Sequence, residues 1–524
     1  MKLRTIVKIA ITSSVVLLCS GFALYSFFRL SAAEGQKDFN LYELVPSTTS
    51  AVFVTDDVLE FVAEVDELTC SKNQQYLYVS KLFSYLKQSL YALSEDTPHG
   101  LSRQMNQMLI SFHEPDNERN QVLYCRLGNG DKELVNRFVR KYISSLYPPK
   151  TFIYKGEEII IYPMADGDFL ACYLTSDFMA LSFQKKLIEN VIDAYKSGKS
   201  LADDSTFTGI RAPKKSAAAA TIYTRMQGMM GWTEFDMKMK DDFIYFSGIT
   251  HDADTCFAFI NQLRQQQSVK GFPGEVLPST AFYFSRQGIT DWVSLLSYGN
   301  AQGQSVPART SEVQNRDKEF SRYLMENAGQ DLVACLFQRE DTLQGAAAVL
   351  SLSVADVTEA ERMLRALVNA APADEGRRNP RITFCYTVNK AYPIYRLPQT
   401  TLFEQLTSFA EPTLDVYAAF YGGRLLLAPD ADALAHYIRQ LDKGEVLNGA
   451  MAYQTGMDHL SDSYHFMLMA DFDHIFQQSE NHVRFVPDFF LRNADFFRHF
   501  TLFVQFACAD GVVYPNIVLK YKSE

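Results

Sequence analysis

Residues 168–201, DFLACYLTSDFMALSFQKKLIENVIDAYKSGKSL, have the pattern of two strands joined by a tight turn and followed by a helix. The same pattern recurs at residues 415–447, DVYAAFYGGRLLLAPDADALAHYIRQLDKGEVL, at offsets of 247 and 246 residues for its two ends. In each segment a glycine, Gly198 or Gly444, stands where a helix C-cap requires a positive φ. The match indicates that one structural unit occurs twice in the chain.

Further pairs of segments match in the same order along the chain. LVPST at 44–48 recurs as VLPST at 276–280, and an apolar strand follows each, at 51–54 and 281–284. The other matched pairs are two strands with a polar turn (108–127 and 332–352), an amphipathic helix (131–143 and 356–368) and a hairpin (232–250 and 500–522). The sequence therefore predicts two tandem repeats, at residues 39–268 and 269–524.

Each repeat is expected to follow the order β-α-α-β-β-α-β-β-β-β-α-β-β-β. Short turns between successive strands favour a largely antiparallel sheet with helices packed on it, which is an α+β fold. The chain is 47 % apolar and 21 % charged, so it has ample material for packed cores. Residues 399–412 and 477–497 have no counterpart in the first repeat and are expected to project from the second as insertions. The aromatic side chains of the later insertion are alternatively expected to line a groove for an apolar ligand.

The N-terminal segment predicts a transmembrane anchor. The run from Ile9 to Phe28 contains no charged residue and is twenty residues long, between Lys8 and Arg29. A helix that crosses the hydrocarbon core needs about 20 such residues. Lysine and arginine precede the run, so residues 1–29 are expected to place the N-terminus in the cytoplasm and the rest of the chain outside, after a spacer at 30–38. Cleavage after residues 31–33, Ser-Ala-Ala, is the alternative.

The cysteines are expected to be buried thiols. Five of the eight lie inside apolar strand-like runs, and no CxxC pair is present, which argues against a zinc or thioredoxin-type site. One or two disulfides remain the alternative. The five are Cys125, Cys172, Cys335, Cys385 and Cys508.

Motifs of known chemistry are incomplete in this chain. Gly198-Lys199-Ser200 ends like a phosphate-binding loop, but it follows a helix and lacks the earlier glycine, so a helix C-cap explains it. Ser182 and Lys185 have the spacing of a serine nucleophile and its base, but the companion motifs are absent, and Ser182 is expected to be a helix N-cap.

One group of metal-ligand residue types stands out in the second repeat. Asp471, Asp473 and His474 follow an apolar strand, and carboxylates with imidazoles are common metal ligands. No histidines here have the i, i+4 spacing of two ligands on one helix face. These three residues are therefore only a weak candidate site, and the sequence implies no cofactor. The net charge of −11 argues against a nucleic-acid partner.

The anchor, the spacer, the LVPST strand and the segment GKSLADDSTF at 198–207 resemble a family of bacterial membrane-anchored proteins that carry a domain of unknown function. The resemblance implies that the chain is anchored in the bacterial inner membrane, with most of its residues in the periplasm or outside. It supplies no catalytic residue. We expect a non-enzymatic, membrane-tethered envelope protein that binds a protein, lipid or glycan through a surface between its two copies. The alternative is an envelope hydrolase or metal-dependent enzyme that uses Asp471, Asp473 and His474.

Overall fold

The computed structural model describes most of the chain after residue 38. The described residues are 39–73, 106–113, 119–128, 131–138, 147–164, 167–211, 218–225, 231–250, 258–293, 295, 311–339, 345–370, 380–388, 390–398, 400–407, 415–478, 486 and 488–522. The predicted anchor, Ile9 to Phe28, lies outside these residues. Among the helices within them, none is long and apolar enough to cross a membrane.

The first half of the chain, residues 39–268, contributes ten strands that pair antiparallel in the order β4-β5-β6-β7-β3-β2-β1-β8-β9-β10. Their bounds and those of the helices between them are η1 (Leu41–Leu44), β1 (Ala51–Thr55), α2 (Val58–Glu67), α3 (Thr69–Lys72), β2 (Met108–Phe112), β3 (Gln121–Arg126), α5 (Asp131–Phe138), β4 (Lys150–Tyr154), β5 (Glu157–Pro163), β6 (Phe169–Leu174), β7 (Phe178–Ser182), α6 (Lys185–Ser197), η3 (Leu201–Asp203), α7 (Ser205–Ile210), β8 (Ala220–Thr224), β9 (Thr233–Lys240), β10 (Phe243–Thr250) and α8 (Ala258–Arg264).

The second half, residues 269–524, contributes ten strands in the order β15-β16-β17-β18-β14-β13-β12-β20-β21-β22, again antiparallel. A short separate ladder joins β11 to β19. The bounds are β11 (Val269–Lys270), η4 (Pro273–Glu275), β12 (Ala281–Gly288), α10 (Ser311–Asn327), β13 (Ala328–Gln338), β14 (Ala346–Val354), α11 (Val357–Ala370), β15 (Ile382–Tyr386), β16 (Ala391–Pro398), α12 (Leu402–Leu406), β17 (Asp415–Tyr421), β18 (Arg424–Ala428), α13 (Ala431–Asp442), η5 (Leu447–Gly449), α14 (Met451–Met457), β19 (Ser463–Tyr464), β20 (Phe466–Asp471), α15 (Phe472–Phe476), α17 (Asp488–Arg492), α18 (Ala494–Phe497), β21 (Phe500–Ala509) and β22 (Val512–Tyr521).

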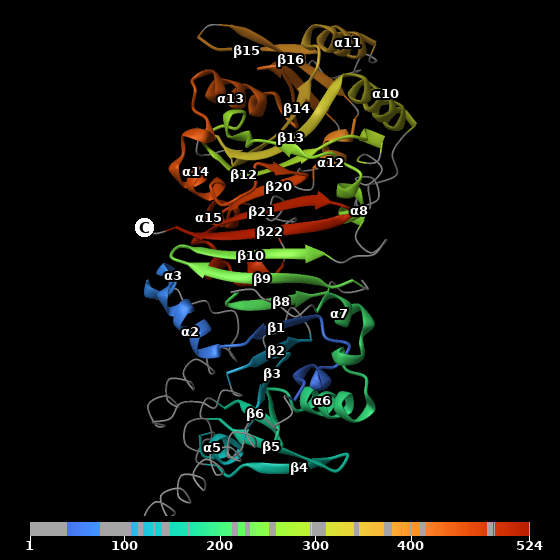
Figure 1. Cartoon of the computed structure of the whole chain (residues 1–524). Coiled ribbons are helices and arrows are strands. Elements are labelled where there is room, and N and C mark those ends of the chain that lie inside the picture. The colour runs from blue at the N-terminus through green and yellow to red at the C-terminus, as the bar shows by residue number, and fades with distance from the viewer. Residues whose placement is uncertain are drawn as a thin grey trace, which may run out of the picture.

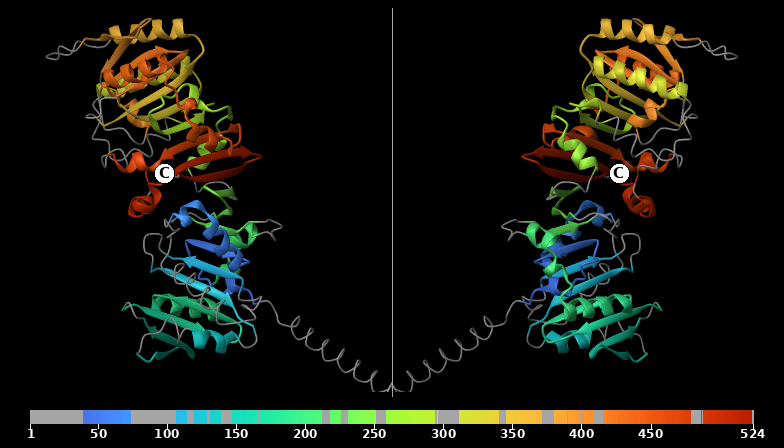
Figure 2. Two further views of the ribbon diagram at one scale, coloured as in Figure 1. Left: turned by 90° about the vertical axis from the view of Figure 1, so that its left-hand side faces the viewer. Right: turned by 90° about the vertical axis from the view of Figure 1, so that its right-hand side faces the viewer.

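The two halves are joined edge to edge. Strand β10 of the first half pairs antiparallel with β22 of the second, for example through Ile244 opposite Leu519, so all twenty strands form one continuous sheet. The strands are stacked along the molecule from β4 at one end to β15 at the other (Figure 1). The C-terminus lies near the middle of this stack, beside the junction (Figure 2). The expectation of an α+β fold with a largely antiparallel sheet is confirmed.

Local sequence signals account for the turns between the strands. Asp241, with a φ of 50°, forms the turn between β9 and β10, and Asp510 and Gly511, with φ of 52° and 79°, form the turn between β21 and β22. Gly198 is the left-handed C-cap of α6, at a φ of 63°, and Gly444 follows α13 at a φ of 75°. Short polar residues and glycine reach positive φ at the lowest cost, so both predicted hairpins and both helix ends form where expected.

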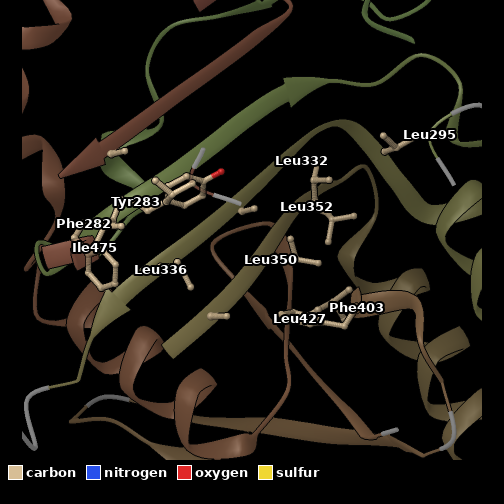
Figure 3. Packing of buried hydrophobic residues seen from close by; sticks show 14 of the residues in the cluster. Phe282, Tyr283, Leu295, Leu332, Leu336, Leu350, Leu352, Phe403, Leu427 and Ile475 are labelled. Carbon is tan, nitrogen blue, oxygen red and sulfur yellow. The ribbon is translucent and has the colours of Figure 1, made fainter. Parts of the chain in front are cut away.

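One apolar core crosses the junction between the halves. Phe61 of α2 and Ile244 of β10 belong to the same buried cluster as Phe472 of α15 and Leu519 of β22. The cluster continues into the second half, where leucines of β13 and β14 face Phe403 and Leu427 (Figure 3). The opposite face of the sheet has two further clusters, under α6 in the first half and under α13 in the second. The halves therefore share a core as well as a strand ladder.

The expectation that the two insertions project from the second half is wrong for the parts that the structure describes. In the first, Leu402 and Phe403 of α12 are 0 % and 1 % exposed, and Asp317 of α10 holds the segment through the hydroxyl groups of Thr400 and Thr401, each at 2.8 Å. Apolar residues gain more from burial than from exposure, so the segment folds back onto the core.

The second insertion folds back in the same way. Phe497 is buried, and the ring of Phe490 stacks on that of Phe472 with centroids 4.9 Å apart. In the described part of the insertion these aromatic rings pack against the core.

Candidate functional site

The weak candidate site predicted at Asp471 is an ion-pair cluster that ends strand β20. Asp471 is the N-cap of α15, and its carboxylate accepts a hydrogen bond from the backbone N–H of Asp473 at 3.1 Å. The ammonium of Lys522 lies 2.6 Å from Oδ1 of Asp471. Nδ1 of His474 lies 3.4 Å from Oδ2, which is an ion-pair contact without the alignment of a hydrogen bond. Both carboxylate oxygens are therefore engaged by groups of the protein itself.

The charges of this cluster stabilise one another. Burial raises the pKa of Asp471, but the neighbouring His474 and Lys522 lower it by more, so the pKa of this carboxyl lies below its usual value. The carboxylate of Asp471 in turn raises the pKa of His474 above its usual value, against the opposing effect of burial. Asp471 is thus held ionised as a helix cap and ion-pair partner.

The geometry does not gather Asp471, Asp473 and His474 as metal ligands. Within the described residues there is no group of three or more His, Cys, Asp or Glu side chains placed to hold a metal ion. Asp471 and His474 contact each other, and the backbone N–H of Asp473 serves the cap. The arrangement can stabilise the start of α15 and tie it to the end of β22, and its carboxylate is not free to act as a base.

The two other motifs considered in the sequence also have structural roles. Ser182 is the last residue of β7 and is fully buried, and its hydroxyl donates to the carbonyl of Gln121 at 2.7 Å. The N-cap of α6 is Gln184, so the expectation that Ser182 is the N-cap is wrong by two residues. Lys185 pairs with Glu189 at 2.7 Å, one turn along α6. A nucleophile that is closed to solvent and lacks its base cannot attack a substrate.

The cysteine expectation is confirmed at four of the five positions. Cys125, Cys172, Cys335 and Cys385 are buried with free thiols. Cys508, near the end of β21, is only half-buried, so the expectation of full burial is wrong there.

Sequence reasoning missed a buried polar group on strand β2. The hydroxyl of Ser111 lies 2.9 Å from Nε2 of His113 and 3.0 Å from the hydroxyl of Tyr124. Burial lowers the pKa of His113 to about 4, so the imidazole is neutral at pH 7. Ser111 is 0 % exposed, which closes it to any substrate. The S-x-H spacing, which puts both side chains on one face of a strand, was the signal that could have found it.

A second missed group crosses four strands of the second half. The carboxylate of Asp331 on β13 forms ion pairs with Arg286 of β12 at 3.1 Å and with Arg424 of β18 at 3.3 Å. Arg424 also donates a hydrogen bond to the hydroxyl of Ser351 on β14 at 2.6 Å. The arginines hold the pKa of Asp331 below its usual value against the effect of burial. This network is buried and internally paired, so it fixes strand positions.

One face of the sheet at the junction, which we call the junction face, carries partly exposed side chains of mixed chemistry. It consists of side chains that point to the same side of β9, β10 and β22, as the pairing of Tyr245 with Lys238 and Val518 places them. Its members that reach solvent are Glu234, Asp236, Lys238, Lys240, Phe243, Tyr245, Ser247, Ile249, Tyr514, Asn516 and Lys520.

The junction face combines aromatic rings with charges of both signs. Ile249 and Tyr514 are each 37 % exposed. Phe243 and Tyr245 stack with centroids 5.7 Å apart, and the ammonium of Lys520 lies 5.8 Å from the centre of the Phe243 ring. The other side of the same strands is covered by the core that includes Phe61 and Ile244. The ring of His459 packs against Phe243 with centroids 4.4 Å apart, so this ring is only partly exposed. A surface of this composition can bind a partner by ring contacts and paired charges, and it lies where the two halves meet.

Comparison with family models, with curated proteins and with solved structures finds no match to this chain.

Proposed function

We propose that this chain is a membrane-tethered, non-enzymatic protein of the bacterial cell envelope, built from two copies of one module and belonging with the uncharacterised anchored proteins that it resembles. Its outer region binds a protein partner through the junction face. The run from Ile9 to Phe28 supports the tether, since its length and lack of charge suit a membrane span. The observation that carries the binding proposal is the exposed aromatic and charged sheet surface at the meeting of the two halves.

The relation between the halves supports a duplicated module. If the strands of each half are numbered 1 to 10 along the chain, leaving aside the short β11 and β19, both halves have the same strand order in the sheet. From the outer edge inward this order is 4-5-6-7-3-2-1-8-9-10. An isolated bridge joins Pro46 to Ser200 in the first half, and its counterpart joins Pro278 to Val446 in the second. These bridges fall on the segments that match in sequence, so local sequence and long-range contacts repeat together.

The composition of the junction face favours a protein over a lipid surface. Protein interfaces are enriched in aromatic residues at their centre and carry polar residues at the rim. Tyr245 and Tyr514 supply such rings, and Glu234, Lys238 and Lys240 supply charges of both signs. A lipid surface would be served better by a cationic or wholly apolar face.

A non-enzymatic role is supported by the state of the polar clusters. Asp471 is engaged by Lys522, Asp331 by two arginines, and Ser111 and Ser182 are closed to solvent. In the described part of the chain these groups hold strands and helix ends in place.

Photo-crosslinking in intact cells tests the proposal. A photoreactive amino acid at Ser247, in the middle of the junction face, should give a covalent adduct with one protein. The same group at Ser176, an exposed serine in the turn between β6 and β7, is the matched control. An adduct that consists of lipid or glycan, or equal labelling from both positions, contradicts the assignment of a protein partner to this face.

The tether has its own test. Membrane fractionation should place the full-length chain in the membrane, and N-terminal sequencing should find residues before Ile9. A soluble mature chain that begins near Glu34 would show cleavage and would remove the anchor from the proposal.

A further inference from the structure

The two outer strands of the sheet differ in the residues that line and precede them. β15 and β4 lie at opposite ends of the strand stack (Figure 1), and among the described strands each pairs on one side only, β15 with β16 and β4 with β5. An outer strand exposes unpaired backbone N–H and C=O groups, which can pair with a strand of another chain.

β15 carries an exposed apolar stripe. Ile382, Phe384 and Tyr386 alternate along the strand and are 37 %, 54 % and 70 % exposed, and Val388 in the following turn is 95 % exposed. Cys385 points to the other side and is buried at 1 %. The sequence ITFCYTV from 382 to 388 contains no charge, so nothing within it repels an approaching strand.

The strand is also held firmly in place. The guanidinium of Arg381 donates to the last carbonyls of α11, on Val368 at 3.2 Å and on Asn369 at 3.0 Å. A rigid edge pairs at a smaller entropic cost than one that must be ordered on contact.

β4, the equivalent outer strand of the first half, is also exposed, with Phe152 at 43 % and Ile153 at 71 %, but it carries residues that oppose strand addition. Pro148 and Pro149 precede it, and Lys150 begins it. The ammonium of Lys185 lies 5.1 Å from the centre of the Phe152 ring, and the hydroxyl of Tyr154 donates to Asp193 at 3.1 Å. Proline and lysine at an edge are the usual means of preventing strand addition.

We propose that β15 is the contact through which two copies of this chain associate, as an antiparallel pair about a two-fold axis. The chain itself shows that its module joins edge to edge in this manner, since β10 and β22, the last strands of the two halves, pair antiparallel at the junction. The proposal concerns a different edge from the junction face and is independent of the partner proposed there.

The sequence of β15 is self-complementary in that arrangement. With Phe384 opposite Phe384, Ile382 lies opposite Tyr386 on the same face, so every exposed apolar side chain of the strand meets another. Arg381 then lies opposite Thr387, and no like charges face each other along the strand. Cross-strand pairs of aromatic and β-branched residues are among the most favourable in antiparallel sheets.

Disulfide trapping of the full-length chain in lipid nanodiscs tests the contact. Residues directly opposite across an antiparallel pair are within reach of a disulfide, so the single substitution Phe384→Cys should give a covalent dimer on mild oxidation. Phe152→Cys, at the equivalent place on β4, should stay monomeric and is the matched control.

Mass measurement by light scattering provides the second readout. The unsubstituted chain should have the mass of two chains, and Phe384→Lys should halve it while circular dichroism stays unchanged, because Phe384 is exposed. A mass of one chain for the unsubstituted protein overturns the proposal. A dimer that survives Phe384→Lys also overturns the proposal, because it would place the contact elsewhere, for example in the anchor.

Discussion

The hydroxyl of Tyr245 on β10 lies 3.3 Å from Nδ1 of His459, just beyond α14, and the two rings meet edge to face with centroids 5.4 Å apart. The first residue belongs to the first half of the chain and the second to the second half. On this face the contact supplements the ladder between β10 and β22, and on the opposite face both halves share one core. The junction is therefore a packed and hydrogen-bonded part of the fold.

We expect Leu519→Ala to destabilise both halves together. Leu519 lies in the shared core, and removing a buried leucine side chain leaves a cavity that costs about 2–5 kcal/mol in the free energy of unfolding. The chain has two tryptophans, one in each half: Trp232 and Trp292, both buried. Fluorescence of single-tryptophan variants during urea unfolding should show both probes shifting to the same lower midpoint. Separate midpoints, or a shift of Trp292 alone, would show that the halves unfold independently.

Two glycines should respond to alanine with opposite signs. A Cβ on Gly248 of β10 would lie 2.7 Å from the ring of Phe235 and 2.8 Å from Pro515, so Gly248→Ala should cost about 1–3 kcal/mol through overpacking. Gly209 in α7 has no atom within 4 Å of such a Cβ, and Gly209→Ala should gain about 0.4–1 kcal/mol by restricting the unfolded chain. Urea midpoints of the two variants against the parent chain check both signs. Equal effects of the two substitutions would contradict the close packing at Gly248.

The cluster at Asp471 predicts a pH-dependent contribution to stability. The folded pKa of Asp471 is below its unfolded value of about 3.9, so its stabilisation is present above that pH and is lost as the pH falls through the folded pKa. The folded pKa of His474 is raised, so its contribution is present below about pH 6.5 and is lost as the pH rises through the folded pKa. Both contributions are present together between these limits.

Asp471→Asn tests this, because asparagine keeps the helix cap and removes the charge. At pH 5.5 it should lower the free energy of unfolding by about 1 kcal/mol, since an ion pair at a partly exposed site contributes about that much at most. The loss should shrink as the pH falls through the lowered folded pKa of Asp471, where the parent carboxyl also becomes neutral. Asp473→Asn, two residues away, is the control and should stay within about 0.5 kcal/mol. No loss at pH 5.5 would assign the role of Asp471 to the cap alone, since asparagine keeps the cap.

The cysteines should differ in reactivity. Burial raises the pKa of Cys125 and of Cys172 to about 12, and these thiols should be labelled by a maleimide or aromatic disulfide only after denaturation. Cys508 is half-buried and its pKa is raised to about 11, so it should be labelled slowly in the native chain and faster as the pH rises. Mass mapping of labelled peptides checks this, with Cys508→Ser as the control. Native labelling at Cys125, or bands that shift between non-reducing and reducing gels, would contradict it.

The order of strands and helices was predictable because it depends on near neighbours. Short continuous apolar runs determine strands such as β2 and β3. Polar or glycine residues at 241 and 510–511 determine the turns of the β9–β10 and β21–β22 hairpins. The errors lie where contacts from distant segments decide. The hydroxyl of Ser182 donates to the carbonyl of Gln121, 61 residues away, and also accepts from the backbone N–H of Gln184, so Ser182 ends β7 and Gln184 takes the cap position.

The prediction of a site at Asp471 was not met for the same reason, since a contact from a distant segment decided it. Asp471 and His474 are close in sequence, and their pairing was foreseeable from the helical spacing of three residues. Lys522, which occupies the carboxylate, comes from a strand 51 residues later, and no local pattern points to it. Likewise, the sequence of the insertions shows aromatic residues, and only packing reveals that Phe490 and Phe497 complete the core around Phe472.

The sequence by itself determined the α+β character of each half, the succession of its elements and the burial of most of its cysteines, because periodicity and turn chemistry act over a few residues. Only the tertiary structure decided that β10 meets β22, that the two halves share one sheet and one core, and that β4 and β15 are the outer strands. Strand pairing uses backbone N–H and C=O groups, which hardly differ between residues, so the sequence of an outer strand does not determine which strand pairs with it. That choice is made by the burial of side chains from segments hundreds of residues apart.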